Sequence, residues 1–266
     1  MIVIKYGGHA MTDSDGLFAK AVQDVLDVGE DCVIVHGGGP QIDAALKSEN
    51  IDTAFVSGFR VTSREAFDVV QRVLTGEVLR TLVGQLRGAG LNAVGLTGRD
   101  GGLLTAKKMR QFVDGAEIDL GQVGEIIRVD TAILKCLIDS GFLPVISPVA
   151  TEGDETLENS AIGLNVNADL AAAAIAGALE ASTLIFMTDV PGIYRNWPDT
   201  SSLISSIRTQ ELSDMKDHFT EGMAPKVFAC LNAMNSGAKS VRVIDGTDPL
   251  SFALALRGIG GTLVLP

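Results

Sequence analysis

Positive charge is scarce in this chain. Its 266 residues include 21 lysines and arginines against 33 aspartates and glutamates, which gives a net charge of −12 at pH 7. Nucleic acids and anionic membranes are bound by basic faces, so this balance argues against both as partners. Any phosphate group that the chain binds must be held by a few local lysines and by backbone amides.

Cysteine and long apolar runs are scarce as well. Cys32, Cys136 and Cys230 show no C-x-x-C spacing. An odd number of thiols in apolar settings is typical of core residues in a protein that is kept reduced, so we expect a cytoplasmic location. No apolar run reaches the roughly 20 residues of a membrane helix. Because a strand begins at the first residue, we also expect no signal peptide.

Several common ligand-binding motifs are missing. No G-x-x-x-x-G-K-[ST] occurs, which excludes a P-loop. The run from Gly37 to Ile42 lacks the third glycine of the dinucleotide fingerprint, and no acidic residue closes the strand before it. His9, His36 and His218 lack metal-ligand spacing, and no Ser–His–Asp order stands out. We therefore expect no metal site built by protein side chains.

Short apolar runs alternate with helical patterns along the whole chain. This alternation predicts an α/β fold with a mainly parallel sheet and helices on both faces. The runs are rich in Val, Ile and Leu, as strands covered on both faces are. We expect strands at 1–5, 32–36, 92–97, 143–147, 183–187 and 240–244, and helices at 14–28, 40–49, 63–88, 130–141, 167–180, 209–217, 222–236 and 249–256.

Three segments bear on how the chain is organised. Residues 63–88 show one long helical pattern, which suits a dimer interface as well as it suits covering the sheet. Residues 101–128 predict antiparallel hairpins near a sheet edge. The acidic stretch 151–155 is the best internal boundary. It would divide one continuous domain into an N-terminal lobe, 1–150, and a C-terminal lobe, 151–266.

Two of the expected strands run directly into glycines. Lys5 and Tyr6 are followed by Gly7-Gly8, and the strand at 32–36 is followed by Gly37-Gly38-Gly39. Bare N–H groups at strand ends can approach a ligand closely, and a helix that begins just beyond adds the positive end of its dipole. One such turn is equally well explained as a tight turn. Two of them, with Lys5 beside the first, predict an anion site whose expected occupant is a phosphoryl group in transit.

Two lysines and a polar run are candidates for that site. Lys5 ends the first strand, where open α/β sheets bind ligands, although it could also be a solvated strand-end lysine. Lys226 falls in the first turn of a helix, where the dipole disfavours a cation unless an anion is near. Asn167 and Asp169 are a natural cap and first-turn acid. The run from Asn165 to Asp169 nevertheless holds more polar groups than one cap requires, and Asp169 could hold both lysines.

Two further segments follow strand-like runs. Arg60, in the run from Gly58 to Thr62, suits a clamp that grips a carboxylate through two parallel hydrogen bonds. Residues 188–194 follow the strand at 183–187 and contain Pro191 and Gly192. They are either a plain turn or a loop that faces a nucleotide.

Taken together, these segments resemble the amino acid kinase family over essentially the whole chain. The resemblance implies a three-layer αβα sandwich, with an acyl-amino-acid lobe followed by an ATP lobe. It also implies ATP-dependent phosphorylation of the side-chain carboxylate of N-acetyl-L-glutamate, a step of arginine biosynthesis. The motifs that carry it are KYGG at 5–8, HGGGPQI at 36–42, GFRVT at 58–62, GLTGRDG at 95–101, NVNAD at 165–169 and GMAPKV at 222–227.

The resemblance also implies residue roles. Lys5 and Lys226 would stabilise the transferring phosphoryl group, and Asp169 would orient both lysines. Backbone N–H groups would come from Gly8, Gly38 and Gly39. Arg60 would bind the α-carboxylate of the substrate, and Asn165 its acetylamino end. The adenine nucleotide would lie along Asp189, Val190, Gly192, Ile193, Tyr194, His218, Phe219 and Thr220.

The chemistry expected from the residues agrees with that reaction. A glutamate carboxylate has a pKa of about 4.3, so it is already ionised at neutral pH and needs no general base. The barrier comes from the repulsion of two anions and from charge on the equatorial oxygens, which positioning and fixed positive charge reduce. Mg²⁺ would arrive with ATP and be held mainly by the phosphates.

Two alternatives stay open at this point. One is a sister kinase acting on acetylaminoadipate, glutamate, aspartate, carbamate or a nucleoside monophosphate. The other is a non-catalytic nucleotide-binding protein of the same fold, against which the presence of both Lys5 and Lys226 argues. Arginine-inhibited members of the family carry an extra N-terminal helix, whereas here a strand begins at residue 1. We therefore expect a homodimer that is insensitive to arginine.

Overall fold

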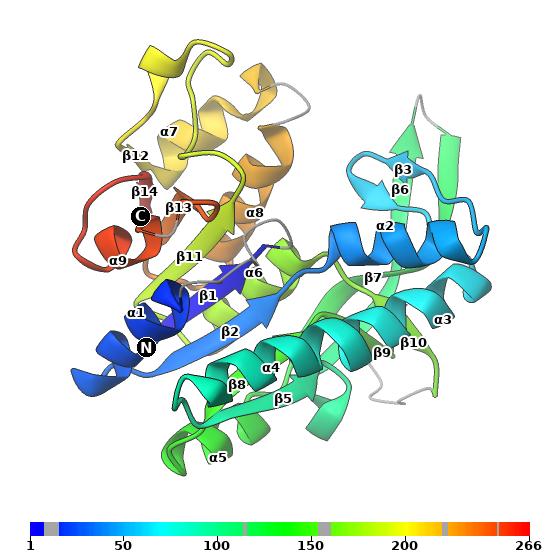
Figure 1. Cartoon of the computed structure of the whole chain (residues 1–266). Helices are drawn as coiled ribbons and strands as arrows, with labels where there is room; N and C mark the ends of the chain where they lie inside the picture. Colours follow the sequence, from blue (N-terminus) through cyan, green and yellow to red (C-terminus); the bar gives the residue numbers. More distant parts are fainter. Residues whose placement is uncertain (8–15, 114–115, 154–160, 220–222, 249) are drawn as a thin grey trace.

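The apolar runs pair into one central sheet of eight strands, shown in the computed structural model in Figure 1, in the order β12-β14-β13-β11-β1-β2-β8-β5. β1 pairs in parallel with β2 on one side and with β11 on the other. β13 and β14 run antiparallel, while the other neighbouring strands run parallel. The predicted α/β class and the mainly parallel sheet are confirmed.

The structure describes residues 1–7, 16–113, 116–153, 161–219, 223–248 and 250–266. The strands are β1 Ile2–Tyr6, β2 Cys32–His36, β3 Phe55–Val56, β4 Phe59–Arg60, β5 Ala93–Thr97, β6 Leu104–Val113, β7 Ala116–Val129, β8 Leu143–Ser147, β9 Val149–Glu152, β10 Gly163–Asn165, β11 Thr183–Thr188, β12 Ser206–Arg208, β13 Val241–Asp245 and β14 Thr262–Leu265. The helices are α1 Leu17–Asp27, α2 Gly39–Ser48, α3 Arg64–Arg72, α4 Leu79–Gly88, α5 Ala132–Asp139, α6 Ala168–Ala178, α7 Thr209–Asp214, α8 Ala224–Asn235 and α9 Ser251–Leu256, with a π-helical segment at Val73–Val78 and 3₁₀ turns at Asp100–Gly102, Thr200–Ser202 and Lys216–His218.

Helices cover both faces of the sheet, which gives the three-layer αβα sandwich. Apolar side chains of α1, α4 and α9 pack on one face, against residues such as Ile34 and Ile185. Those of α5, α6, α7 and α8 pack on the other face, against residues such as Val35 and Phe186. Alternate residues of each strand point to opposite faces, so strands buried on both sides must be apolar throughout. That requirement explains the continuous Val/Ile/Leu runs.

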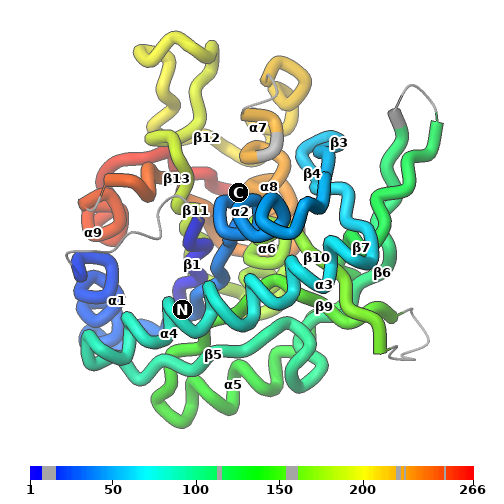
Figure 2. Tube along the Cα trace, turned by 45° about the vertical axis from the view of Figure 1, so that its right-hand side comes forward, coloured from blue at the N-terminus to red at the C-terminus, as the bar shows by residue number. Residues whose placement is uncertain are grey.

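A small second sheet and a long helix complete the fold. Strands β10, β7, β6 and β9 close into a four-stranded barrel, whose β6–β7 hairpin extends from the body in Figure 2. Beside the barrel, α3, the π-helical segment and α4 follow one another directly, and α2 packs against this rod. α3 and the π segment belong to a third apolar cluster with α2, whereas α4 packs on the central sheet.

The predicted elements are largely confirmed, with boundary shifts of at most three residues at the helix ends that the structure describes. The helices predicted at 14–28, 222–236 and 249–256 begin at residues outside the described ones. The hairpin predicted within 101–128 is present, but it belongs to the separate barrel and not to an edge of the main sheet. The short strands β3, β4, β9, β10, β12 and β14 were not predicted.

Two smaller expectations can also be compared with the structure. Cys32 and Cys230 are buried, but Cys136 is exposed on α5, so the expectation that all three are core residues was wrong for Cys136. Within the described residues, no helix is both long enough and apolar enough to cross a bilayer. Of the predicted boundary 151–155, residues 154 and 155 lie outside the described residues.

Candidate active site

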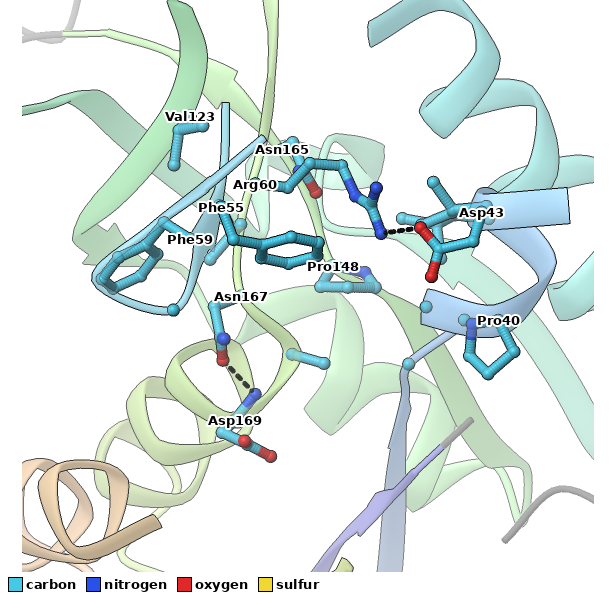
Figure 3. A pocket seen from close by; sticks show the side chains of 18 of the residues that line it. Pro40, Asp43, Phe55, Phe59, Arg60, Val123, Pro148, Asn165, Asn167 and Asp169 are labelled. Carbon is cyan, nitrogen blue, oxygen red and sulfur yellow. Dashed lines mark hydrogen bonds and ion pairs between the residues drawn. The ribbon is translucent and has the colours of Figure 1, made fainter. Parts of the chain in front are cut away.

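A cavity of about 490 Å³ opens at the carboxyl ends of β1 and β2 (Figure 3). The glycine loop and the start of α2 form one wall, the β3–β4 hairpin a second, and the start of α6 a third. Ligands of open α/β sheets bind in this position because strand ends and helix N-termini converge there. Six residues predicted from the sequence line this one cavity: Lys5, Gly38, Gly39, Arg60, Asn165 and Asp169.

An ion pair at the base of the cavity joins Lys5 to Asp169. Lys5 Nζ lies 2.9 Å from Asp169 Oδ1, and the lysine side chain is only 13% exposed. The contact is an ion pair whose geometry is not that of a well-directed hydrogen bond, since Asp169 Oδ1 is buried without a hydrogen-bond partner among the described residues. Asn167 caps α6 by accepting hydrogen bonds from the N–H groups of Asp169 (2.8 Å) and Leu170 (3.3 Å). The cap thus places Asp169 in the first helical turn, facing the end of β1.

Gly7 makes room for the ammonium group of Lys5. A Cβ atom on Gly7 would lie 3.3 Å from Lys5 Nζ and 2.8 Å from the carbonyl oxygen of Met187 on β11. The second distance is too short for a real side chain, and the carbonyl belongs to a paired strand that cannot easily move. Only glycine therefore fits here, which the sequence alone does not reveal, because the contact joins residues 180 positions apart.

The second lysine makes an ion pair with a carboxylate other than the predicted Asp169. Lys226 Nζ, at the start of α8, lies 3.2 Å from Asp189 Oδ1, and Asp189 is more than half exposed. Asp169 also faces α8: burial, and secondarily the charge of Asp169, raise the pKa of the Cys230 thiol on that helix. A role of Asp169 in orienting Lys226 stays a prediction. The residue predicted to contact nucleotide, Asp189, anchors this lysine.

Arg60 lies on the far wall of the cavity and is already engaged. Its Nη2 makes an ion pair of 2.6 Å with Asp43 Oδ1, its Nη1 donates to Thr53 Oγ1 at 2.9 Å, and its guanidinium stacks 4.6 Å from the ring centre of Phe55. Figure 3 shows Arg60 and Asp43 pointing toward one another across the cavity. The arginine side chain is 8% exposed and Asp43 58% exposed. A ligand carboxylate would compete with the more exposed Asp43 for a guanidinium that is already oriented.

Asn165 sits at the end of β10, beside Arg60. Its Nδ2 donates to Thr62 Oγ1 at 3.3 Å, and Thr62 Oγ1 in turn donates to the carbonyl oxygen of Arg60 at 2.7 Å. This chain of hydrogen bonds ties Asn165 to the segment that carries Arg60. Sequence reasoning missed Thr53, Thr62 and Asp43, because no local pattern marks a contact with a partner on another element.

Those residues predicted to line the nucleotide that the structure describes are not among the residues lining this cavity; they lie on the segment after β11 and at the end of the 3₁₀ turn before α8. Ile193 and Tyr194 are buried, and the Ile193 N–H donates to Thr262 Oγ1 at 2.8 Å. Their side chains pack in the core, so any contact with a nucleotide would use the backbone. His218 is exposed. Gly192 packs tightly against Thr262, and Phe219 packs on the core. The backbone of Val190 is hydrogen-bonded to Thr188 Oγ1. Gly8 and Thr220 lie outside the described residues.

The described part of the chain contains no group of three or more His, Cys, Asp or Glu side chains placed to hold a metal ion. What the arrangement offers is fixed positive charge. Two ammonium groups, each paired with a carboxylate, accompany a glycine-rich helix N-terminus and an oriented guanidinium. Such a set stabilises charge that develops on phosphoryl oxygens and needs no proton transfer.

Comparison with known proteins agrees with this class of site. The amino acid kinase family pattern matches residues 1–245. A protein of Paenarthrobacter aurescens named acetylglutamate kinase is 48% identical over 274 residues, which cover 100% of this chain and 86% of the relative. One of Streptomyces coelicolor with the same name is 45% identical, again over 100% and 86%. A crystal structure from Streptococcus mutans superposes with a TM-score of 0.80 at 26% identity, covering 99% of this chain and 98% of the other.

The family match and the relatives place this αβα protein among the kinases, and the chain belongs to the amino acid kinase family. Within that family, the relatives that match the full length of this chain carry the name acetylglutamate kinase. The three-layer fold expected from the resemblance is confirmed.

Proposed function

We propose that this chain transfers the γ-phosphoryl group of ATP to the side-chain carboxylate of N-acetyl-L-glutamate, giving N-acetyl-L-glutamyl 5-phosphate in arginine biosynthesis. The observation that carries the proposal is the cavity with Lys5 and Asp169 at its base and Arg60 and Asn165 on its far wall. One end suits a phosphoryl group and the other a carboxylate and an amide. The name shared by the full-length relatives supports the same substrate.

The chain's own residues would lower the barrier by charge and position. Lys5 and Lys226 neutralise the repulsion between the incoming carboxylate and the γ-phosphoryl group, and Asp169 and Asp189 hold the ammonium groups before substrate binds. The N–H groups of Gly38 and Gly39, at the start of α2, face developing negative charge with the helix dipole behind them. No general base is required because the acceptor is ionised at neutral pH.

Arg60 and Asn165 would select the substrate. Arg60 binds the α-carboxylate, with Thr53 and Phe55 keeping the guanidinium oriented while Asp43 yields its place. Asn165 binds the acetylamino group. A substrate without that group would leave the amide of Asn165 without its partner, and buried polar groups without partners cost binding energy.

The remaining parts of the proposal concern nucleotide and assembly. ATP binds along the segment after β11 and the stretch from His218 to Thr220, and Mg²⁺ comes with it, held mainly by phosphate oxygens. Residues 1–150 form the lobe for the acylated amino acid, which Asn165 of the other lobe completes, and residues 151–266 form the lobe for ATP. The working form is a homodimer in the cytoplasm, insensitive to arginine.

The direct test is a hydroxamate assay on the purified chain with ATP and Mg²⁺. N-acetyl-L-glutamate should give acyl hydroxamate at a rate at least about a hundredfold above L-glutamate, L-aspartate or carbamate, because each of these lacks a group that Arg60 or Asn165 would bind. A Lys5→Ala variant purified in parallel controls for contaminating kinases. No turnover of N-acetyl-L-glutamate, or a faster reaction with carbamate, would sink the proposal.

A further inference from the structure

A buried histidine stands directly before the glycine loop. His36, the last residue of β2, is 0% exposed, and its Nδ1 lies 2.8 Å from the carbonyl oxygen of Gly37. A carbonyl oxygen can only accept, so Nδ1 carries the ring proton and donates it. Nε2 is then an acceptor, and it is buried without a hydrogen-bond partner among the described residues. The ring is therefore in the Nδ1–H tautomer, and Nδ1 is the nitrogen that contacts the glycine loop.

That hydrogen bond orients the peptide unit between Gly37 and Gly38. In a trans peptide the C=O and the N–H lie in one plane and point in opposite directions. His36 holds the Gly37 carbonyl on its own side of the loop, so the N–H of Gly38, a residue that lines the cavity, points away from the imidazole.

The neighbouring peptide groups are held by backbone hydrogen bonds, whereas this one makes none with another backbone group among the described residues. The Gly37 N–H donates to the Tyr6 carbonyl at 2.9 Å, and the Gly38 carbonyl accepts from the Ile42 N–H at 2.9 Å. Between these two anchors, the Gly37–Gly38 peptide is flanked by residues without a Cβ, so sterics alone would let it rotate. His36 supplies the contact that decides which way it faces.

Ser147 on β8 is the neighbour of His36 across the sheet. β2 and β8 pair Ile34 with Val145 and Val35 with Ile146, so the next step of the same register sets His36 beside Ser147. Ile34 and Val145 pack on the same face of the sheet, and residues two further along share that face. Ser147 Oγ is also buried without a hydrogen-bond partner among the described residues, so it and His36 Nε2 are not hydrogen-bonded to each other in this structure. A hydroxyl can donate, and Nε2 of this tautomer can accept.

We propose that His36 is a positioning residue of the phosphoryl site: its Nδ1–H holds the Gly37–Gly38 peptide with the Gly38 N–H facing the transferring group. The inference deepens the proposed function and rests on it. Burial lowers the pKa of His36 from its ordinary 6.5 to about 4, with the Gly37 hydrogen bond opposing in part, so the ring stays neutral at the working pH.

A packing role alone would not call for an imidazole. Leucine or methionine would fill the space without leaving a buried acceptor, and an unpaired buried nitrogen costs stability. The hydrogen bond to Gly37 is what an aliphatic side chain cannot replace.

Two variants separate positioning from packing. In His36→Asn the amide nitrogen stands where Nδ1 stood and keeps a donor near the Gly37 carbonyl, whereas His36→Leu keeps the bulk and removes the donor. We expect His36→Leu to lower kcat about ten- to hundredfold with KM for N-acetyl-L-glutamate within about threefold, because a donor aimed at the transferring group acts in the transition state. His36→Asn should recover most of that loss. Equal loss in both variants, or an unchanged kcat in His36→Leu, would overturn the inference.

A second measurement does not depend on activity or on the folding of a variant. Nitrogen-15 NMR of the wild-type imidazole ring should show His36 protonated at Nδ1 and bare at Nε2. A ring protonated at Nε2 in the wild type would refute the proposal. If the wild type fails to phosphorylate N-acetyl-L-glutamate while the ring shows the expected tautomer, the proposed substrate is wrong and the loop geometry stands.

Discussion

Each of the two lysines predicted to bind the phosphoryl group makes an ion pair with an aspartate of the protein itself: Lys5 with Asp169, and Lys226 with Asp189. The ion pairs keep each ammonium group charged and oriented, so little reorganisation is needed when phosphates arrive. Such pairs also explain why a lysine can stand at the N-terminus of α8, where the helix dipole alone disfavours it.

Lys226→Ala tests the contribution of the second lysine. We expect kcat to fall at least about a hundredfold with a modest change in KM, because the ammonium group acts mainly on charge that develops in the transition state. Steady-state kinetics measure both constants, and Lys135→Ala, on the exposed surface of α5, is the matched control. An unchanged kcat would remove Lys226 from the mechanism.

Arg60→Lys tests the carboxylate clamp. Lysine keeps the charge but loses the fork that reaches Asp43 and Thr53 together, so KM for N-acetyl-L-glutamate should rise about ten- to hundredfold with kcat within about threefold. Arg64→Lys, an exposed arginine at the start of α3, should change neither constant. A rise confined to KM for ATP would mean that Arg60 binds ATP and not N-acetyl-L-glutamate.

The buried His36 predicts an acid-sensitive fold. Its pKa is about 4 in the folded chain and ordinarily 6.5, so between these values the unfolded chain binds more protons. Its contribution to stability is therefore complete above pH 6.5 and is lost as the pH falls toward 4, a loss of about 2 kcal/mol at pH 5. Urea unfolding at pH 7.5 and pH 5 measures it. The difference between wild type and His36→Asn isolates this residue from the carboxylates, and an equal loss in both would contradict the assignment.

Among the elements, α6 and α8 decide where Asp169 and Lys226 stand. The alanine-rich α6 lies so close to α8 that a Cβ on Gly177 would come within 2.2 Å of the carbonyl oxygen of Ser236, the C-cap of α8. Small side chains let the two helices approach, and their N-terminal ends then carry the aspartate and the lysine to the same region of the site.

Gly177→Ala should push these helices apart and destabilise the fold by about 1–3 kcal/mol, because the added methyl group has no space. Gly84→Ala in α4, where a Cβ meets nothing within 4 Å, should instead stabilise the fold by roughly 0.5–1 kcal/mol through helix propensity. Chemical denaturation of the two variants compares them directly. Equal effects would mean that α6 and α8 tolerate a wider spacing.

The elements that the sequence predicts and those it does not differ in length and burial. β1, β2, β8 and β11 are continuous apolar runs whose burial the composition alone requires. β3, β10 and β12 have two or three residues each, and their pairing comes from distant partners, so no local pattern marks them. In the site, the motifs locate Lys5, Arg60 and Asn165. The contacts Asp43–Arg60, Asp189–Lys226 and Gly7–Met187 join separate elements and become visible only in the fold.

Across the whole molecule, the acceptor cavity and the segment predicted for the nucleotide lie on different groups of elements around one sheet. Ligands that bind only the folded state stabilise it, by about 2.7 kcal/mol at a hundred times Kd. N-acetyl-L-glutamate with ADP and Mg²⁺ should therefore raise the melting temperature by roughly 5 °C. L-glutamate at the same concentration should raise it less, because it lacks the acetyl group. Differential scanning calorimetry makes the comparison, and equal shifts would count against recognition of the acetyl group.

The π-helical segment Val73–Val78 rotates the apolar face of α4 relative to that of α3 in the long rod that the three segments form. Its wider turn holds one residue more than an α-helical turn, and one residue rotates a helix by about 100°. That offset lets Phe67 and Val70 face α2 while Leu82 and Leu86, further along the same rod, face the central sheet. Deleting any one residue of the segment would restore regular α-helical hydrogen bonding but destabilise the fold, since one of the two apolar faces would turn to solvent. Substitutions in this rod can be absorbed, but its residue count cannot change.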